Sequence, residues 1–487
     1  MPTQDLIVSS LPDDDRRLSY TFMGRRLYAW NAPLYVHDVV RSRPALVLGS
    51  TGFGKSEFML SLAFSDASKK RPVFFLDGKC DMRTLNKLYF YAKQAQRPFM
   101  TLMPFQDGDR HTASWNPFVS SILPISVITE AFVNAYSDPK RALNRNDPSG
   151  SGYYIEMQRA VCGNLIRALH STGYQYCIND LRYLLDNIDI LERVIQPILR
   201  PDGHQPYGEV MRLRKEEPDE FPRIIRRFTN YLGQFRHWAI NSYNPGFTIE
   251  RAIDMAAVVY IGLPVDSQPV EMAAIGNMLI NLLRATSSHL QTKGIPLQRP
   301  VSCIADEAGA FIDSGLAEWI CKVRSTGFML TLGVQTLSQL EGRYEGFGSE
   351  VRANSPNIMI YNPRDAQTAD WFSKLVGNEA RYSITATRKE DEETGDGTVK
   401  LYEAPKVHRD AILSLAPGQF FYNPALSTDH PPLLAAPMLP SPDSRNPAIA
   451  YRRTNVFPEA RRKGLYLSAI LHNRRFGAGV GAGSARR

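Results

Sequence analysis

The stretch that decides the fold is "ALVLGSTGFGKSEFML" (residues 45–60), in which a short apolar run leads into a glycine-rich turn and then a helical pattern. It fits the phosphate-binding motif G-x-x-x-x-G-K-[ST] with Gly49, Ser50, Thr51, Gly52, Phe53, Gly54, Lys55 and Ser56. Glycines are needed because successive backbone N–H groups must point at phosphate oxygens, at φ angles that side chains disfavour. We predict that this loop binds ATP, with Lys55 on the β- and γ-phosphates and the Ser56 hydroxyl on Mg²⁺.

A pair of acids closes a second apolar run, "VSCIADE" (residues 301–307). A nucleotide-hydrolysing site needs an acid at the end of another strand, and Asp306 and Glu307 stand at such an end. We predict that Asp306 holds the Mg²⁺ shell and that Glu307 polarises the attacking water. The alternative is an Asp-Glu pair that caps the next helix. Together with the loop, the second acid favours an ATPase over a kinase.

Two further residues are candidates for contact with the nucleotide. Gln335 ends the run "FMLTLGVQ" (residues 328–335) and is predicted to read the γ-phosphate; alternatively, it is an ordinary hydrogen-bonding residue at a strand end. Arg324 comes just before that strand and is a candidate arginine finger, acting on the nucleotide of a neighbouring subunit. The alternative is a solvated arginine at a helix end, and Arg343 and Arg352 are other candidates for the finger.

Apolar runs typical of buried strands recur along the chain. They span residues 45–49, 73–78, 256–264, 301–307, 328–335 and 357–362. Near-continuous hydrophobicity is typical of parallel strands covered on both faces, and helical patterns separate the runs. We predict an α/β fold, namely a RecA-like P-loop NTPase with a mainly parallel central sheet.

One long interval lacks this alternation. Between about Ser126 and Tyr243 the strand signals almost vanish, while apolar residues follow helical stripes. We predict an all-helical domain inserted into the ATPase domain. The predicted division is an N-terminal part of the ATPase domain (1–125), the inserted all-α domain (126–245), a C-terminal part of the ATPase domain (246–435) and a basic, partly disordered tail (436–487).

The net charge of the chain lies in that tail. The 487 residues carry a formal charge of +8, and residues 441–487 hold ten Lys or Arg against Asp443 and Glu459. Such a tail is predicted either to add salt-dependent affinity for DNA phosphates or to bind a protein partner. Five scattered cysteines with no CxxC pair argue against a disulfide framework or a zinc site and indicate a reducing cytoplasm. No apolar run reaches the roughly 18 residues of a membrane-spanning helix, so we expect a cytoplasmic protein.

Several longer stretches resemble the coupling ATPases of conjugative and type IV secretion systems, of the TraD/TraG type within the FtsK–HerA group. The resemblance covers most of residues 40–425. It rests on the acid-pair strand and on "GVQTLSQL" (333–340), "TADWFSKLVG" (368–377), "LDGKCD" (76–81), "WNPF" (115–118) and "EAPKVHRDAILSLAPGQFFY" (403–422). "DGKCD" departs from the family pattern because it lacks the proline that is common there.

The resemblance implies a cytoplasmic homo-hexamer that hydrolyses ATP with Mg²⁺ and drives DNA, or protein-bound DNA, toward a secretion channel. It assigns catalytic roles to Lys55, Glu307, Gln335 and Arg324, and metal-binding roles to Ser56 and Asp306. It also implies sequence-independent contact with DNA and partners from the relaxosome or the channel, which the helical insertion would meet. Most such proteins begin with transmembrane helices, whereas this sequence shows no apolar run of that length. We therefore expect this chain to reach the bacterial inner membrane only through a partner.

Other functions stay open at this point. The chain could be a secretion-channel assembly ATPase, a soluble DNA pump of the FtsK–HerA kind, or a nucleotide-gated recruitment scaffold in which Glu307 is inert. The arginine-bearing segment 221–238 could touch phosphates, although an exposed helix face is the simpler interpretation. The acidic stretch 388–398 is predicted to be a solvated loop or a dock for a basic partner.

Overall fold

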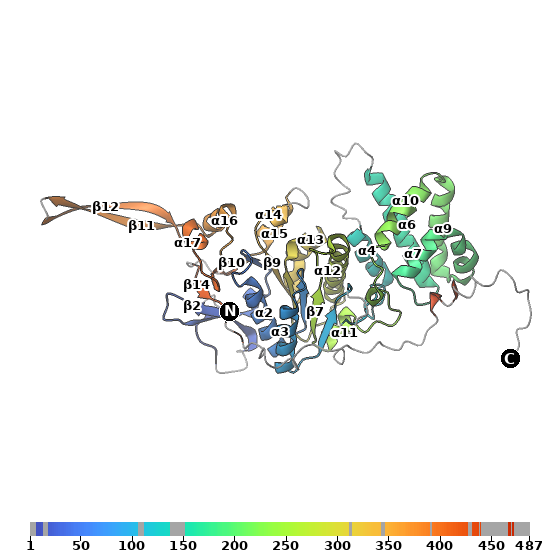
Figure 1. Ribbon diagram of the computed structural model, residues 1–487, viewed down its shortest axis with the longest axis horizontal. Coiled ribbons are helices and arrows are strands. Elements are labelled where there is room, and N and C mark those ends of the chain that lie inside the picture. Colours follow the sequence, from blue (N-terminus) through green and yellow to red (C-terminus); the bar gives the residue numbers. More distant parts are fainter. Residues whose placement is uncertain are drawn as a thin grey trace, which may run out of the picture. The chain divides into compact units, whose positions relative to one another are not determined.

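The chain forms two compact units, residues 1–65 with 329–441 and residues 66–328 with 442–487. Their elements are labelled in Figure 1. The computed structural model describes residues 6–12, 18–105, 112–136, 151–310, 314–341, 346–389, 392–426, 431–437, 439, 466–468 and 470–471. Residues 137–150 and nearly all of the predicted basic tail lie outside these residues.

The first unit contains the strand that leads into the phosphate loop. Its strands are hydrogen-bonded in the order β1-β3-β2-β14-β13-β10-β4-β9. The β10–β4 and β4–β9 pairs are parallel and the other pairs are antiparallel. The strands are β1 (Ile7–Val8), β2 (Tyr20–Arg26), β3 (Pro33–His37), β4 (Ala45–Leu48), β9 (Phe328–Val334), β10 (Asn357–Ile360), β13 (Gln419–Asn423) and β14 (Leu433–Ala435).

Short helices follow these strands, and their ends carry the expected capping residues. Asp365 starts α16 (Ala366–Val376) by accepting hydrogen bonds from the N–H groups of Gln367 and Thr368, and Gly377 ends it at a positive φ of 84°. The remaining helices of this unit are α1 (Asp38–Arg41), α2 (Lys55–Ser68), α14 (Ser338–Glu341), α15 (Phe347–Asn354) and α17 (Arg409–Leu413).

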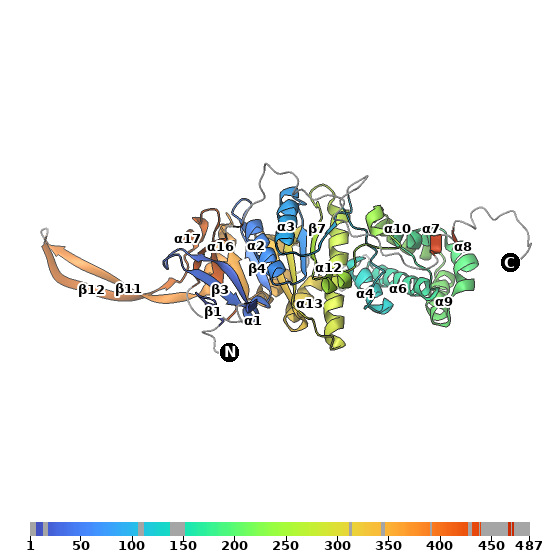
Figure 2. The same cartoon turned by 90° about the horizontal axis from the view of Figure 1, so that it is seen from below.

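A long hairpin projects from the first unit. Strands β11 (Asn378–Lys389) and β12 (Glu392–Pro405) pair antiparallel as a separate two-stranded sheet (Figures 1 and 2). The prediction of an acidic loop at 388–398 was wrong, because all of this stretch except residues 390–391, which are not described, lies in the two strands. After a register shift between Ala386 and Arg388 the pairing resumes with Glu393 and Glu392, and the low strand propensity of such acidic residues concealed it.

The second unit is built on a parallel sheet in the order β8-β5-β7-β6. Its strands are β5 (Val73–Asp77), β6 (Phe99–Leu102), β7 (Val258–Gly262) and β8 (Val301–Asp306), and every residue in them is buried. Burial on both faces explains why these strands read as continuous apolar runs. All six predicted strand runs are therefore confirmed, and so is the α/β fold with a mainly parallel sheet.

Helices surround this sheet. They include α3 (Met82–Gln94), α11 (Ile249–Asp254), α12 (Pro269–Thr292) and α13 (Ser314–Lys322), with 3-10 turns η5 (Trp238–Ile240), η6 (Ala308–Ala310) and η7 (Val323–Thr326). None of the helices in the described part of the chain combines the length and apolarity that crossing a membrane requires.

Between β6 and η5 the described residues form helices and no strand. These are α4 (Ile125–Tyr136), α6 (Ser151–Ser171), α7 (Ile178–Asp186), α8 (Ile188–Ile190), α9 (Pro201–Glu216) and α10 (Phe221–Leu232), with the π and 3-10 turns η3 (Leu191–Ile195) and η4 (Gln196–Ile198). The apolar stripe of α6 faces inward, since Val161, Leu165 and Leu169 are buried. That this interval is an inserted domain with limits at 126 and 245 stays a prediction.

The "WNPF" stretch has a structural role in this unit. Asn116 is fully buried, and its Nδ2 donates hydrogen bonds to the carbonyl oxygens of Tyr176 and Ser242 at 2.8 and 3.0 Å. Its Oδ1 accepts from the Phe118 N–H at 3.0 Å. One amide thus satisfies three buried backbone groups from three segments that are distant in sequence.

We predict that Asn116→Ala lowers the free energy of unfolding by at least about 2 kcal/mol, because each buried polar group that loses its partner costs about 1–3 kcal/mol. Urea unfolding followed by circular dichroism measures this loss. Asn187→Ala is the matched control, since Asn187 is exposed and donates to a single carbonyl, that of Tyr183. Equal stability of the two variants would contradict the proposed role of Asn116.

Candidate functional site

The phosphate loop joins the buried strand β4 to α2. Its three glycines adopt positive φ angles of 149° at Gly49, 87° at Gly52 and 102° at Gly54. Lys55 is the first residue of α2, and only 4% of its surface is exposed. A glycine-rich turn that opens a helix, with an inward-held lysine, has the geometry that binds phosphate through backbone N–H groups and the helix dipole.

Neighbouring segments of the same unit hold the loop in place. The Ser50 N–H and hydroxyl donate to the carbonyl oxygens of residues 362 and 363 at 2.9 and 2.6 Å. The Phe53 carbonyl accepts from the Gly418 N–H at 2.9 Å, and the Arg364 guanidinium lies 5.1 Å from the centre of the Phe53 ring. The loop is thus anchored on both sides by protein contacts, so its shape does not depend on a ligand.

Gly49 is required by packing as well as by its φ angle. A Cβ atom at this position would lie 2.5 Å from the Cβ of Tyr361, whereas a Cβ at Gly52 would meet nothing within 4 Å. Tyr361 is fully buried and stacks on Phe420, with ring centres 5.0 Å apart. Because both partners in the clash are close to the backbone, a side chain at Gly49 could be accommodated only by a shift of β4 or of the segment after β10.

Gln335 stands at the same edge of the sheet as the loop. β4 and β9 pair in parallel with Leu48 opposite Val334, so Gln335 directly follows the residue beside the start of the loop. The Gln335 backbone N–H donates to Oε1 of Gln339 at 2.8 Å, which fixes the turn after the strand. The structure therefore brings Gln335 together with the loop residues, and its role as a γ-phosphate sensor stays a prediction.

The predicted acids belong to a second constellation, in the other unit. β5 and β8 pair in parallel with Asp77 directly opposite Asp306, and both side chains are 3% exposed. Asp77 accepts hydrogen bonds from the Tyr260 hydroxyl at 2.8 Å and from the N–H groups of Lys79 and Asp81 at 3.0 and 2.9 Å. Burial, and next the negative charge of Asp306, raise the pKa of Asp77 to about 6.

Glu307 is held by an ion pair in an unusual backbone conformation. Its carboxylate accepts a hydrogen bond from the Lys79 ammonium, and its φ is +54°, in the left-handed region that few side chains occupy. Burial alone would lower the pKa of Lys79, but the hydrogen bond and charge of Glu307, with Asp306 and Asp77, raise it. Strained backbone of this kind costs about 1–3 kcal/mol and is typical of functional sites.

Asp77, Lys79 and Tyr260 have no predicted role in the sequence. The stretch "LDGKCD" after an apolar run was the sequence signal for Asp77 and Lys79, but it entered only as part of the family resemblance. Burial above all raises the pKa of the Cys80 thiol in this turn to about 12, which disfavours the nucleophilic thiolate. Its sulfur also requires a glycine nearby, since a Cβ at Gly262 would lie 2.6 Å from the Cys80 Sγ.

The candidate arginines differ in their surroundings. Arg324 is exposed in η7, as both the finger and the solvated interpretation require. Arg352 forms an ion pair with Glu341 at 3.1 Å, and Arg343 lies outside the described residues. On α10 the apolar face is buried, while Arg223, Arg226 and Arg227 are exposed.

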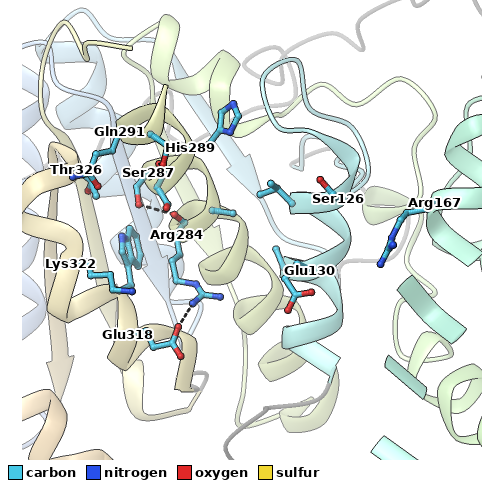
Figure 3. Close-up of a pocket in the computed structure, with 16 residues that line it drawn as sticks. Ser126, Glu130, Arg167, Arg284, Ser287, His289, Gln291, Glu318, Lys322 and Thr326 are labelled. Atoms are coloured by element: carbon cyan, nitrogen blue, oxygen red, sulfur yellow. Dashed lines mark hydrogen bonds and ion pairs between the residues drawn. The ribbon is translucent and has the colours of Figure 1, made fainter. Parts of the chain in front are cut away.

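A cavity of about 680 Å³ in the second unit is not part of the predicted site. It is lined mainly by residues of α4, α12 and α13, and Figure 3 shows Arg284 and Glu318 of its wall joined as an ion pair at 2.6 Å. None of the predicted nucleotide-contacting residues lines it. The donor sets suited to Mg²⁺-ATP are instead the phosphate loop with the Ser56 hydroxyl, and the carboxylates at the end of β8, since Mg²⁺ prefers oxygen ligands.

Comparisons with known proteins agree with this geometry. The family model described as "TraM recognition site of TraD and TraG" matches residues 300–416. The Type 4 coupling protein DotL of Legionella pneumophila subsp. pneumophila is 19% identical over 412 residues, which cover 73% of this chain. The chain spans about half, 52%, of the length of that curated relative.

Solved structures of a bacterial conjugative coupling protein share the fold. The trigonal form of TrwBdeltaN70 in complex with sulphate superposes with a TM-score of 0.58 at 14% identity, covering 90% of this chain and 92% of the other. The plasmid coupling protein TrwB in complex with ADP and Mg²⁺ gives a TM-score of 0.56 at 14% identity, covering 88% and 92%. The fold and the loop define a RecA-like P-loop NTPase. Within that class, the predicted resemblance to type IV secretion coupling ATPases is confirmed.

We predict that Gly49→Ala lowers the free energy of unfolding by about 1–3 kcal/mol more than Gly52→Ala, the typical cost of overpacking. Both alanines would share the strain of a positive φ, but only the first would clash with Tyr361. Urea unfolding of the two variants without nucleotide isolates the free-energy cost of this clash. Equal losses would show that packing against Tyr361 does not restrict position 49.

Proposed function

We propose that the chain is an ATP-hydrolysing motor that couples DNA, or a protein–DNA substrate, to a conjugative or type IV secretion channel and drives its translocation. The observation that carries this proposal is the phosphate loop, which protein contacts hold in a phosphate-binding shape with Lys55 buried at the start of α2. The similarity to coupling proteins over most of the chain supports the same conclusion.

In this proposal the loop and the acids act on one Mg²⁺-nucleotide. Lys55 binds the β- and γ-phosphates, while the Ser56 hydroxyl and the Asp306 carboxylate belong to the shell of Mg²⁺, which neutralises charge on the phosphate oxygens. Glu307 orients and polarises the attacking water, and its ion pair with Lys79 holds it in position. Asp77 supports Asp306 from the neighbouring strand, opposite it in the register of β5 and β8.

Two residues are proposed to link nucleotide state to assembly. Gln335 reads the γ-phosphate from the strand beside the loop strand. Arg324, exposed in η7, acts as a finger on the nucleotide of the next subunit of a homo-hexamer. An exposed arginine is available to a neighbouring subunit without any rearrangement of its own fold.

The partners in this proposal are DNA and secretion proteins. The exposed arginines of α10 and the basic tail supply sequence-independent contacts with phosphates. The match of residues 300–416 to a TraM recognition region supports contact of that part with a relaxosome or channel protein. The chain is proposed to work in the cytoplasm and to meet the bacterial inner membrane through such a partner.

The steady-state ATPase rate tests the motor function. We expect Mg²⁺-dependent hydrolysis that DNA stimulates strongly. The stimulation by DNA should weaken from low to moderate salt, and the hydrolysis rate should rise more than in proportion to the protein concentration. Lys55→Ala is expected to lower the rate at least about 100-fold, because the lysine stabilises charge on the transferred phosphoryl group. Lys293→Ala, at an exposed lysine after α12, is the matched control.

A rate that is indifferent to single- and double-stranded DNA would contradict the DNA-motor proposal. It would favour a secretion-channel assembly ATPase, whose stimulation should come from protein partners. A rate that Lys55→Ala leaves unchanged would exclude the phosphate loop as the site of hydrolysis.

Glu307→Gln separates nucleotide binding from hydrolysis. We expect this variant to keep its affinity for Mg²⁺-ATP, because the glutamine oxygen still accepts the hydrogen bond from Lys79, while hydrolysis falls about 10²–10⁴-fold through loss of acid–base catalysis. Fluorescent-nucleotide titration and phosphate release measure the two effects. Glu216→Gln, at an exposed position of α9, is the control, and unchanged hydrolysis by Glu307→Gln would favour the recruitment scaffold.

A further inference from the structure

A short piece of the basic tail packs into the second unit. Of the described tail residues, Leu467 is fully buried and Leu471 is 5% exposed. The backbone is helical at residues 467, 468, 470 and 471, and the piece lies beside α7 in both views (Figures 1 and 2). The described residues 466–468, 470 and 471 thus pack on the second unit, which the predicted disorder of the tail did not include; we call them the tail anchor.

Main-chain and side-chain contacts both hold the tail anchor. The Leu467 N–H donates to the Gln175 carbonyl oxygen at 2.8 Å, and Tyr466 forms a parallel β-bridge with Gln175. The rings of Tyr466 and Tyr243 lie 4.9 Å apart, and the Tyr466 hydroxyl accepts from Asn244 Nδ2 at 2.6 Å. A strand-like bridge combined with side-chain pockets is a recurring mode of peptide recognition.

The surface beneath the anchor is rigid. The Tyr243 hydroxyl donates to the two carboxylate oxygens of Asp180 at 2.9 and 2.8 Å, and also forms a hydrogen bond with Ser468 of the anchor. Asp180 is 6% exposed and accepts from the Cys177 N–H at 3.0 Å at the start of α7. Tyr243 is thus fixed by the fold of the helices and presents its ring and hydroxyl to the anchor.

Room remains beside the anchor. A cavity of about 250 Å³ lies between Tyr183 and Asn241 on the protein side and Ser468 and Leu471 on the anchor side. Its wall is part apolar and part amide or hydroxyl. A peptide with a different side chain after the leucine could therefore be accommodated without a change in the helices.

We propose that the groove formed by Gln175, Asp180, Tyr243 and Asn244, here named the Tyr243 groove, is a peptide-recognition site. Its ligand is a short segment that presents Tyr-Leu followed by a leucine four residues later, and the chain's own tail anchor is its built-in, displaceable occupant. This inference does not depend on nucleotide hydrolysis.

The tail anchor can be displaced because it makes few contacts with the Tyr243 groove. Two buried leucines and one stacked tyrosine favour binding, while ordering the backbone of the anchor opposes it. Covalent attachment supplies an effective concentration on the order of millimolar, which keeps a weak peptide bound. A second copy of the segment, supplied by another chain at sufficient concentration, occupies the same groove.

Exchange of the anchor tests the proposal in the full chain. A fluorescent peptide of residues 462–474 is titrated with the wild-type protein and with Leu467→Asp, in which a charge replaces the fully buried leucine. We expect at least tenfold tighter apparent binding to Leu467→Asp, because its own tail no longer competes. Adding Asn244→Ala to this variant should weaken binding, since it removes the hydrogen bond to Tyr466.

Specificity controls decide between recognition and charge attraction. A peptide carrying the same Leu467→Asp change and a scrambled peptide of equal charge should both fail to bind. Equal binding by the scrambled peptide, equal affinity of wild type and Leu467→Asp, or no binding to either protein would each overturn the proposal. Circular dichroism and the ATPase rate of each variant confirm that the fold is intact, and Tyr466→Ala provides a second way to release the anchor.

Discussion

The close approach of two backbone segments at the end of β4 is the constraint on which the nucleotide site depends. The Tyr361 N–H donates to the Leu48 carbonyl oxygen at 2.8 Å, which extends the parallel β4–β10 pairing to the last residue before the loop. That pairing places Tyr361 against Gly49, so the chain can only turn away from the sheet and wrap into the loop. Packing against Tyr361 thus restricts position 49 to glycine as much as phosphate binding does.

Parallel pairing has a comparable effect on the acids of the second unit, but there it brings like charges together. Asp77 and Asp306 face each other across β5 and β8, where burial opposes charge on both. Three hydrogen-bond donors on Asp77 and the Lys79–Glu307 ion pair offset this repulsion. The result is a pair of buried, facing carboxylates, whose mutual repulsion a cation bound at the proposed Asp306 site would relieve.

Structural features that a few contiguous residues determine could be predicted from the sequence, whereas features that depend on strand register could not. The phosphate loop, the six buried strands and the helical stripe of α6 are visible as local patterns. Strand β6 was missed because Thr101 interrupts its four-residue apolar run, and β2 and β3 because polar residues and Gly24 or Pro33 break their apolar runs. The pairing of Asp77 with Asp306 and the burial of Leu467 join residues too distant in sequence for any local pattern to show.

Catalysis requires side chains on a restrained backbone, whereas contact with other molecules requires exposed side chains. The chain places these two kinds of residue largely in different elements. Except for Arg324, the residues proposed for the nucleotide lie at or just after the ends of buried strands, where hydrogen bonds of the sheet restrain the backbone. The β11–β12 hairpin has the reverse character, with Tyr382 71% and Val399 61% exposed on a sheet of only two strands. An isolated two-stranded sheet is marginally stable in water, and exposed apolar side chains gain free energy when another chain covers them. Covering these side chains by another chain would therefore stabilise the hairpin.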